Sequence, residues 1–315
     1  MPLSGSGDFL SWGVFGAVVL GMLALDLGVF HKKSHEVSVK EALGWSAVWV
    51  ALALAFGAGI WWRQGSGPGL EFLTAYLVEK SLSVDNIFVF VMVFAAFGIP
   101  AVRQHRVLFW GVLGALLLRA VFIAAGSALL ARFHWTIYLF GGLLALTGLK
   151  MLFFKAEAED PSQSAAVRLA RRFLPATDKL HGDSFLAVEG GKRVATPLTM
   201  ALAAIEGADV VFAVDSIPAV FAVTLDPFIV YTSNVFAILG LRSMYFVLAG
   251  VVDKFVHLKT GLAFVLLFVG AKMLAIDVVK VPPLVSLAVI SAILTLSVVP
   301  TLLSNRISPC ASANG

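Results

Sequence analysis

The amino-acid sequence predicts an all-α polytopic membrane protein with nine transmembrane helices. Of its 315 residues, 59% are hydrophobic and only 13% are charged, which is outside the usual balance of soluble domains. Apolar runs of about 20 residues, the length that crosses a bilayer, recur along the chain. Charged residues also recur in matching order in two parts of the chain, which indicates an internal repeat.

Nine apolar runs are the expected helices. The first is preceded by Asp8 and by no Lys or Arg, and it lacks a small-residue cleavage site, so we do not expect a removable signal peptide. Together the runs predict a single transmembrane domain over residues 1–304, followed by a tail at 305–315. They cover residues 9–30, 43–62, 70–98, 106–131, 134–154, 196–222, 228–251, 257–276 and 282–304.

The loops between these runs set the expected orientation. Lys and Arg are concentrated in loops on one side of the predicted membrane, above all in 155–195. Cytoplasmic loops carry this excess, so the N-terminus is expected outside and the C-terminus in the cytoplasm. The pI of about 9.2 reflects this bias. The lipid bilayer is an expected partner, and no nucleic-acid partner is expected.

A pair of acidic residues six positions apart occurs twice. The motif Glu79-Lys-Ser-Leu-Ser-Val-Asp85-Asn-Ile is echoed by Asp209-Val-Val-Phe-Ala-Val-Asp215-Ser-Ile. Each copy is followed in order by an arginine (Arg119 or Arg242) and by a lysine (Lys150 or Lys272).

These matches extend over three consecutive helices in each copy, at residues 70–154 and 196–276. Because each copy has three spans, the second enters the membrane from the opposite face. The sequence therefore predicts an inverted-topology repeat of helices three to five and six to eight, an arrangement typical of secondary transporters.

Residues 155–195 form the longest loop of the chain, which joins the two copies. Ala165–Leu174 predicts a short basic amphipathic helix. Phe185–Val188 and Lys192–Ala195, separated by Glu-Gly-Gly, predict a β-hairpin, because glycines supply the positive φ angles of a tight turn. We expect this loop to be a cytoplasmic lid or strut.

Carboxylates at membrane depth are costly unless they meet a partner, so they indicate an ion or proton pathway. Asp85 and Asp209 lie near the middle of their helices, which are entered from opposite sides. The expected metal ligands are Asp85, Asp215, Asp209, Glu79, Glu206 and Asn86. Residues expected on a metal or proton path are Asp26, Ser81 and Ser216.

Positions six apart differ by about 120° around a straight helix, so each acidic pair needs a local break to converge on one ion. Pro218 predicts such a break in the sixth helix, because it lacks an N–H and frees the carbonyl of Val214. Phe88 stands at the matching place in the third helix, where a break is left open.

The basic residues inside the spans have a simpler interpretation. We expect them to form structural ion pairs that hold the acids in place or reach headgroups. They are Arg119, Arg242, Lys150, Lys272 and Lys80.

The donor types favour hard divalent cations. No histidine lies deep in a span, and the single cysteine, Cys310, lies in the tail. Oxygen ligands without imidazole or thiolate favour Mn²⁺, Mg²⁺ or Ca²⁺ over Zn²⁺ and Cu⁺. No bound cofactor is expected, and a divalent metal ion is the other expected partner, as the transported substrate.

The two acidic motifs, together with Thr232-Ser-Asn-Val-Phe-Ala-Ile-Leu-Gly-Leu-Arg242, resemble the TerC family of integral membrane proteins, and within it the Alx branch. The resemblance implies a bacterial inner-membrane Mn²⁺ exporter, related to LysE-like transporters and associated with tellurium resistance. It places the motif acids on Asp85, Asp209 and Asp215, with Glu79 and Glu206 beside them. One departure is Ala208, where the family pattern implies a hydroxyl residue.

Three function classes stay open at this stage. Mn²⁺ efflux, with or without proton coupling, is the leading hypothesis. A non-transporting membrane scaffold, delivering metal to exported enzymes or serving tellurite resistance, is the second, and an amino-acid exporter is the third. An enzyme is not expected, because no nucleophile–base pair or phosphate-binding glycine loop is present. The driving ion, the order of Mn²⁺, Ca²⁺ and Mg²⁺, and the oligomeric state stay open.

Overall fold

The structure, a computed structural model, describes residues 9–30, 38–153, 160–249 and 256–307. Within these residues the chain is almost entirely helical, as the predicted fold class requires. The helices are α1 (Phe9–Phe30), α2 (Val39–Gln64), α3 (Ser66–Ala96), α4 (Ala101–Arg132), α5 (Thr136–Phe153), α6 (Ala165–Phe173), α7 (Pro197–Phe221), α8 (Pro227–Leu239), α9 (Leu241–Leu248), α10 (Val256–Leu274) and α11 (Pro283–Ile307). A 3-10 turn, η1 (Pro161–Gln163), and two strands, β1 (Leu186–Glu189) and β2 (Lys192–Ala195), lie between α5 and α7.

Every predicted apolar run falls on a helix, and the run at 228–251 divides into α8 and α9. Among the described residues, α2, α4, α5 and α7 are long and apolar enough to cross a membrane. Apolar stretches of 10–17 residues lie in α1, α8, α10 and α11. The helix α3 is long but carries Glu71, Glu79, Lys80 and Asp85. The chain thus has the character of a polytopic membrane protein, while the number of nine crossings stays a prediction.

The break predicted at Pro218 is wrong. The helix α7 continues to Phe221 with Pro218 inside its last turn, and helical bonding persists beyond it, since the Ala222 N–H donates to the Pro218 carbonyl at 3.0 Å. Pro218 lacks the N–H that would bond the Val214 carbonyl, yet the helical backbone continues past it, and Pro218 is buried among its neighbours. The helix α3 is also continuous from Ser66 to Ala96.

The interruption occurs instead between α8 and α9. The helix α8 ends at Leu239, α9 begins at Leu241, and Gly240 lies between them. Glycine is a common position for a helix to bend, particularly where a side chain inserts into the hydrogen-bond ladder.

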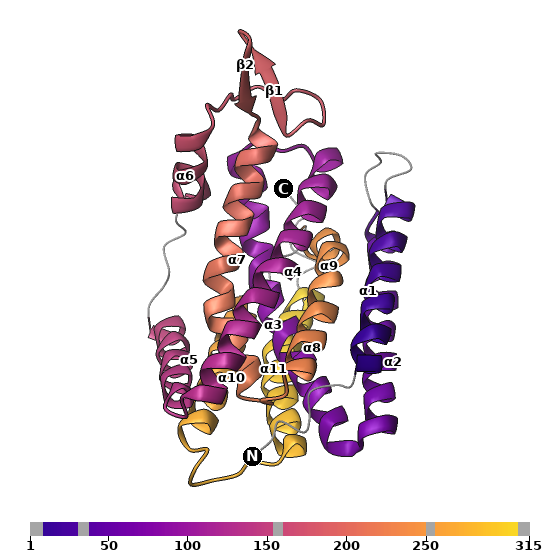
Figure 1. Ribbon diagram of the computed structural model, residues 1–315, viewed down its shortest axis with the longest axis vertical. Helices are drawn as coiled ribbons and strands as arrows, with labels where there is room; N and C mark the ends of the chain where they lie inside the picture. Colours follow the sequence, from indigo (N-terminus) through magenta and orange to yellow (C-terminus); the bar gives the residue numbers. More distant parts are fainter. Residues whose placement is uncertain (1–8, 31–37, 154–159, 250–255, 308–315) are drawn as a thin grey trace.

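The central helices pack in a reciprocal pattern. The helix α3 packs on α7 and α8, α4 packs on α7 and α8, and α5 packs on α10. These helices run side by side in Figure 1, with α1 and α2 along one edge. If α3, α4 and α5 correspond to α7, α8–α9 and α10, the contacts α3–α8 and α4–α7 are equivalent. An inverted repeat is compatible with this pattern, and the repeat itself stays a prediction.

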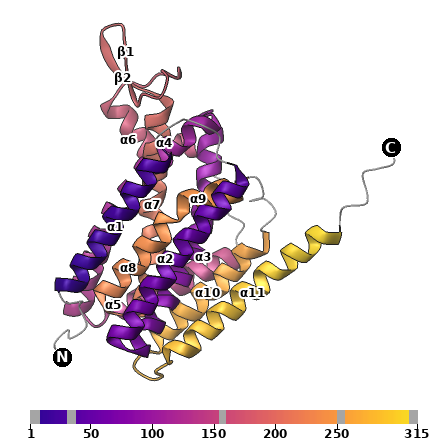
Figure 2. The same cartoon turned by 90° about the vertical axis from the view of Figure 1, so that its right-hand side faces the viewer.

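Glycines allow α5 and α10 to approach closely. A Cβ atom added to Gly148 would lie 2.9 Å from the Ala263 carbonyl oxygen, and one added to Gly270 would lie 2.9 Å from the Gly141 carbonyl oxygen. Small residues at membrane-helix contacts let backbones pack directly against each other. Figure 2 shows that α11 crosses the other helices obliquely, beside α10.

The loop between the two helical halves folds as the sequence predicts. The helix α6 begins at Ala165, and β1 pairs antiparallel with β2 through Gly190 and Gly191, whose φ angles are 56° and 78°. This hairpin projects beyond one end of the helices (Figure 1). Beside it, Arg103 of α4 pairs with Asp183 at 3.2 Å. The cytoplasmic location of this loop stays a prediction.

The helix α6 lies directly against α7. Val167 is fully buried, and a Cβ atom added to Gly207 would overlap the Ala166 side chain. Only glycine at position 207 therefore leaves room for α6, one residue after Glu206 on the helix that carries the second acidic motif.

Replacing Gly148 with Ala should destabilise the protein, because the added methyl group meets the backbone of α10. We expect a loss of about 1–3 kcal/mol, as for other overpacked contacts, measured as a lower Tm in detergent. Gly142→Ala on the same helix is the matched control, since no heavy atom lies within 4 Å of its added Cβ. Equal Tm values for the two variants would contradict the close α5–α10 contact.

Candidate functional site

The first acid of each motif lies in the protein interior. Glu79 on α3 is 0% exposed, and Asp209 on α7 is 5% exposed. Because α3 and α7 pack against each other, the two motif copies meet at these residues. Burial of two carboxylates in one place requires positive charge or hydrogen-bond donors nearby.

Arg119 of α4 supplies both. Its Nη1 donates to Oε1 of Glu79, to Oγ of Ser216 at 3.3 Å and to Oδ1 of Asn234 at 3.2 Å. Its Nη2 donates to Oδ1 of Asp209 at 3.3 Å. One guanidinium group, 1% exposed, therefore joins four helices, α3, α4, α7 and α8. The planar, permanently charged guanidinium suits this bridging role.

The cluster of Glu79, Arg119, Asp209, Ser216 and Asn234 is incompletely satisfied within the described structure. Oε2 of Glu79 and Oδ2 of Asp209 have no hydrogen-bond partner there. Buried carboxylate oxygens without a partner lose their hydration and gain nothing in return. With both acids ionised, the cluster also has one more negative than positive charge. The donors Nε of Arg119 and Nδ2 of Asn234 also lack a partner there. The unpartnered carboxylate oxygens and the net negative charge suit the binding of a further cation.

Glu206 lies one turn from Asp209 on the same helix. Its carboxylate occupies the space that a side chain at Gly114 of α4 would fill. A residue larger than glycine at position 114 would therefore displace Glu206. The sequence predicts Glu206 as a site residue but not Gly114, because a glycine in an apolar run gives no signal of which side chain lies against it.

The second acid of each motif is less buried than the first. Asp215 is half-buried and accepts a hydrogen bond from Thr147 of α5 at 3.0 Å. Asp85 is half-buried on α3. The reason is geometric: α3 and α7 are unbroken, so residues six apart face directions about 120° apart. Among the described residues, no three His, Cys, Asp or Glu side chains gather at a spacing that holds one metal ion.

The remaining predicted polar residues have varied surroundings. Ser81 is buried and donates to the Leu77 carbonyl at 2.6 Å, within its own helix. Asn86 is buried on α3. Asp26 lies in α1, but its side chain is outside the described part of the structure.

Of the predicted structural cations, Arg119 forms the expected ion pairs. Lys80 donates to the backbone carbonyl of Ala237 at 3.3 Å. Arg242 is buried on α9, Lys272 is half-buried on α10, and Lys150 is exposed near the end of α5. Asn234 and Thr147 were not predicted as site residues, since single polar residues in apolar helices are most often packing residues.

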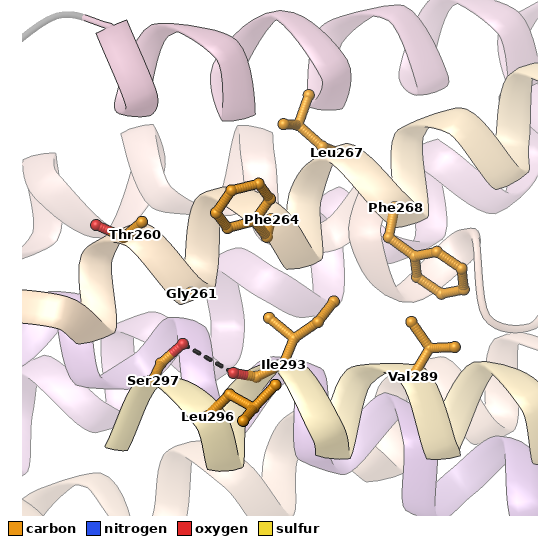
Figure 3. A pocket seen from close by; sticks show the side chains of 9 residues that line it. All are labelled: Thr260, Gly261, Phe264, Leu267, Phe268, Val289, Ile293, Leu296 and Ser297. Atoms are coloured by element: carbon orange, nitrogen blue, oxygen red, sulfur yellow. Dashed lines mark hydrogen bonds between the residues drawn. The ribbon is translucent and has the colours of Figure 1, made fainter. Parts of the chain in front are cut away.

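A groove of about 620 Å³ lies elsewhere, between α10 and α11 (Figure 3). Its lining includes Phe264, Phe268 and Ile293, and the Ser297 hydroxyl donates to the Ile293 carbonyl at 2.8 Å. None of its nine lining residues is charged. It suits an acyl chain better than an ion.

Known proteins resemble this chain over most of its length. A family model described as "Integral membrane protein TerC family" matches residues 64–308. An "Uncharacterized membrane protein STKORF319" of Myxococcus xanthus is 60% identical over 303 residues, covering 96% of this chain and 95% of that protein. The "Putative membrane-bound redox modulator Alx" of Escherichia coli strain K12 is 48% identical over 300 residues, covering 92% and 94%. No solved structure matches the chain with significance.

Replacing Arg119 with Met should destabilise the protein by about 3–5 kcal/mol, because Glu79 and Asp209 would remain buried without their counter-charge. Adding Glu79→Gln and Asp209→Asn should restore much of the lost Tm, since the neutral amides need no counter-charge. Additive losses in the triple variant would contradict the proposed coupling of the three side chains.

Proposed function

The chain belongs to the TerC family of integral membrane proteins, which confirms the resemblance of its motifs, and we propose that it exports Mn²⁺ across the bacterial inner membrane. One observation carries the proposal. Glu79 and Asp209, one from each motif copy, meet on a single arginine, and each has a carboxylate oxygen without a partner in the described structure. Intramembrane carboxylates in such a position are typical of substrate and ion pathways.

The chemistry of the cluster supports a hard divalent cation. Its acceptors are the carboxylates of Glu79 and Asp209, the hydroxyl of Ser216 and the amide oxygen of Asn234. Oxygen donors of this kind suit Mn²⁺, Mg²⁺ and Ca²⁺. Two carboxylates would balance the charge of one divalent ion. With the guanidinium of Arg119 also in place the site would carry one excess positive charge, so we propose that Arg119 withdraws when the ion binds. Arg119 thereby acts as an internal counter-cation that stabilises the site while no metal is bound.

The expected topology gives this site access to both sides of the membrane. In an inverted repeat, α3 and α7 approach the site from opposite faces, and rocking of one copy against the other exposes it alternately. Glu206 on α7 is then a relay residue on the path to Asp209. The proposed orientation places the N-terminus of the chain outside and its C-terminus in the cytoplasm. Asp85 and Asp215 are proposed as further ligands or proton carriers on the same path.

The name of the Escherichia coli relative suggests a redox role. Thiol–disulfide chemistry within one chain requires two cysteines, and this sequence has one. A redox effect of this chain would therefore need a partner thiol, a separate cofactor or an indirect effect of metal export. A non-transporting scaffold is the alternative, and it predicts no metal flux from the purified protein.

Purified protein in proteoliposomes should move Mn²⁺, measured against Mg²⁺ and Ca²⁺ with and without a pH gradient. Glu79→Gln and Asp209→Asn should each lower the initial flux by about tenfold or more, because each removes one charged ligand. Asp178→Asn, in the exposed part of the loop, is the matched control. Absence of flux in the wild type, with correctly folded protein, would favour the scaffold.

In cells, Asp85→Asn and Asp215→Asn should raise manganese content and sensitivity to manganese if these acids lie on the path. The measurement is total cell manganese at equal protein levels. Wild-type accumulation in both variants would restrict the path to the cluster around Arg119.

The substitution Gly114→Ala should reduce Mn²⁺ flux without removing any charged group, because its methyl group takes the place of the Glu206 carboxylate. Gly142→Ala is the control, with open space around its added Cβ. Unchanged flux in Gly114→Ala would show that the position of Glu206 does not matter for transport.

A further inference from the structure

The ammonium group of Lys80 lies at the interruption between α8 and α9. Lys80 follows Glu79 on α3, yet its Nζ donates to the carbonyl of Ala237, in the last turn of α8, at 3.3 Å. A Cβ atom added to Gly240 would lie only 2.7 Å from this Nζ. The ammonium therefore fills the space beside the glycine at which the helix is interrupted.

The end of α8 attracts positive charge. The last carbonyls of a helix lack intrahelical donors and carry the negative end of the helix dipole. Where a membrane helix is interrupted, these carbonyls bind small cations in many transporters. Here the cation at the interruption is part of the chain.

The walls of this space are fixed by neighbouring helices. Trp49 of α2 is 2% exposed, and its Nε1 donates to Oγ of Ser243 on α9 at 3.1 Å. The added Cβ at Gly240 would also lie 3.3 Å from Cβ of Trp49. The space is thus bounded by α2, α3, α8 and α9, and its size is set by a buried tryptophan rather than by a flexible side chain.

We propose that the interruption at Gly240 is a monovalent-cation site, separate from the cluster around Arg119, which the Lys80 ammonium fills in place of Na⁺ or K⁺. Backbone carbonyl oxygens freed at a helix interruption suit such ions. The charge of one ammonium matches one monovalent ion. Ala237 follows Asn234 by three residues, so the site lies about one helical turn from the cluster. By carrying its own cation there, the protein becomes independent of external Na⁺ and K⁺.

The test removes the ammonium and offers a free ion. Wild-type and Lys80→Ala proteins are purified in detergent with a chelator, and Tm is measured in NaCl, KCl and choline chloride at equal ionic strength. The wild type should have the same Tm in all three salts. Lys80→Ala should have a lower Tm in choline chloride, with a saturable rise of about 2–4 °C in NaCl or KCl.

The control is Lys150→Ala, which removes an exposed lysine near the end of α5 and should respond like the wild type. If Lys80→Ala does not yield folded protein, Lys80→Ser is measured in the same salts, because its short side chain also leaves the space beside Gly240 empty. A Tm of the folded variant that is equal in the three salts overturns the proposal. No divalent metal is present, so the result is independent of whether the protein exports Mn²⁺.

Discussion

The hydrogen bonds of Arg119 are the constraint on which the middle of the molecule depends. Arg119 is 1% exposed, so its guanidinium N–H groups need hydrogen-bond acceptors from the protein rather than from water. These acceptors come from α3, α7 and α8. Each of these helices is held at the distance and rotation that bring at least one side-chain oxygen atom to the guanidinium group of Arg119. Burying an unpaired charge costs several kcal/mol for each ion, so any arrangement that separates Arg119 from its two carboxylates is unfavourable.

Close packing around the cluster follows from this constraint. Gly114 of α4 gives way to the carboxylate of Glu206, and Gly126 of α4 to Phe221, because α4 must lie near α7 for Arg119 to reach Asp209. Gly207 allows α6 to lie against the same segment of α7. Gly114 and Gly126 thus leave room for the close α4–α7 approach that the Arg119–Asp209 contact needs.

Much of this could be predicted from the sequence, and the failures have a physical cause. Apolar runs about 20 residues long fixed the position of every long helix, and Gly190-Gly191 fixed the hairpin, because both signals are local. Most residues of the site could be identified because a charged side chain in an apolar segment is energetically costly. Which of them lie together could not be predicted, because that depends on which faces of α3, α4 and α7 meet. The expected break at Pro218 is wrong, because the residues after the proline keep helical hydrogen bonds and α7 runs on to Phe221. The interruption occurs instead at Gly240, where no proline stands.

Two cations of the chain contact α8 about one turn apart. Arg119 binds the side chain of Asn234, and Lys80 binds the carbonyl of Ala237, three residues later. Lys80 is also the residue after Glu79, the acid that pairs with Arg119. A rotation or shift of α3 that releases Glu79 from Arg119 must therefore also move the Lys80 ammonium against the end of α8. Ala237 lies in the last turn of α8, three residues before the interruption at Gly240. The ion pair of Glu79 with Arg119 and the end of α8 are thus linked through two neighbouring residues of one rigid helix.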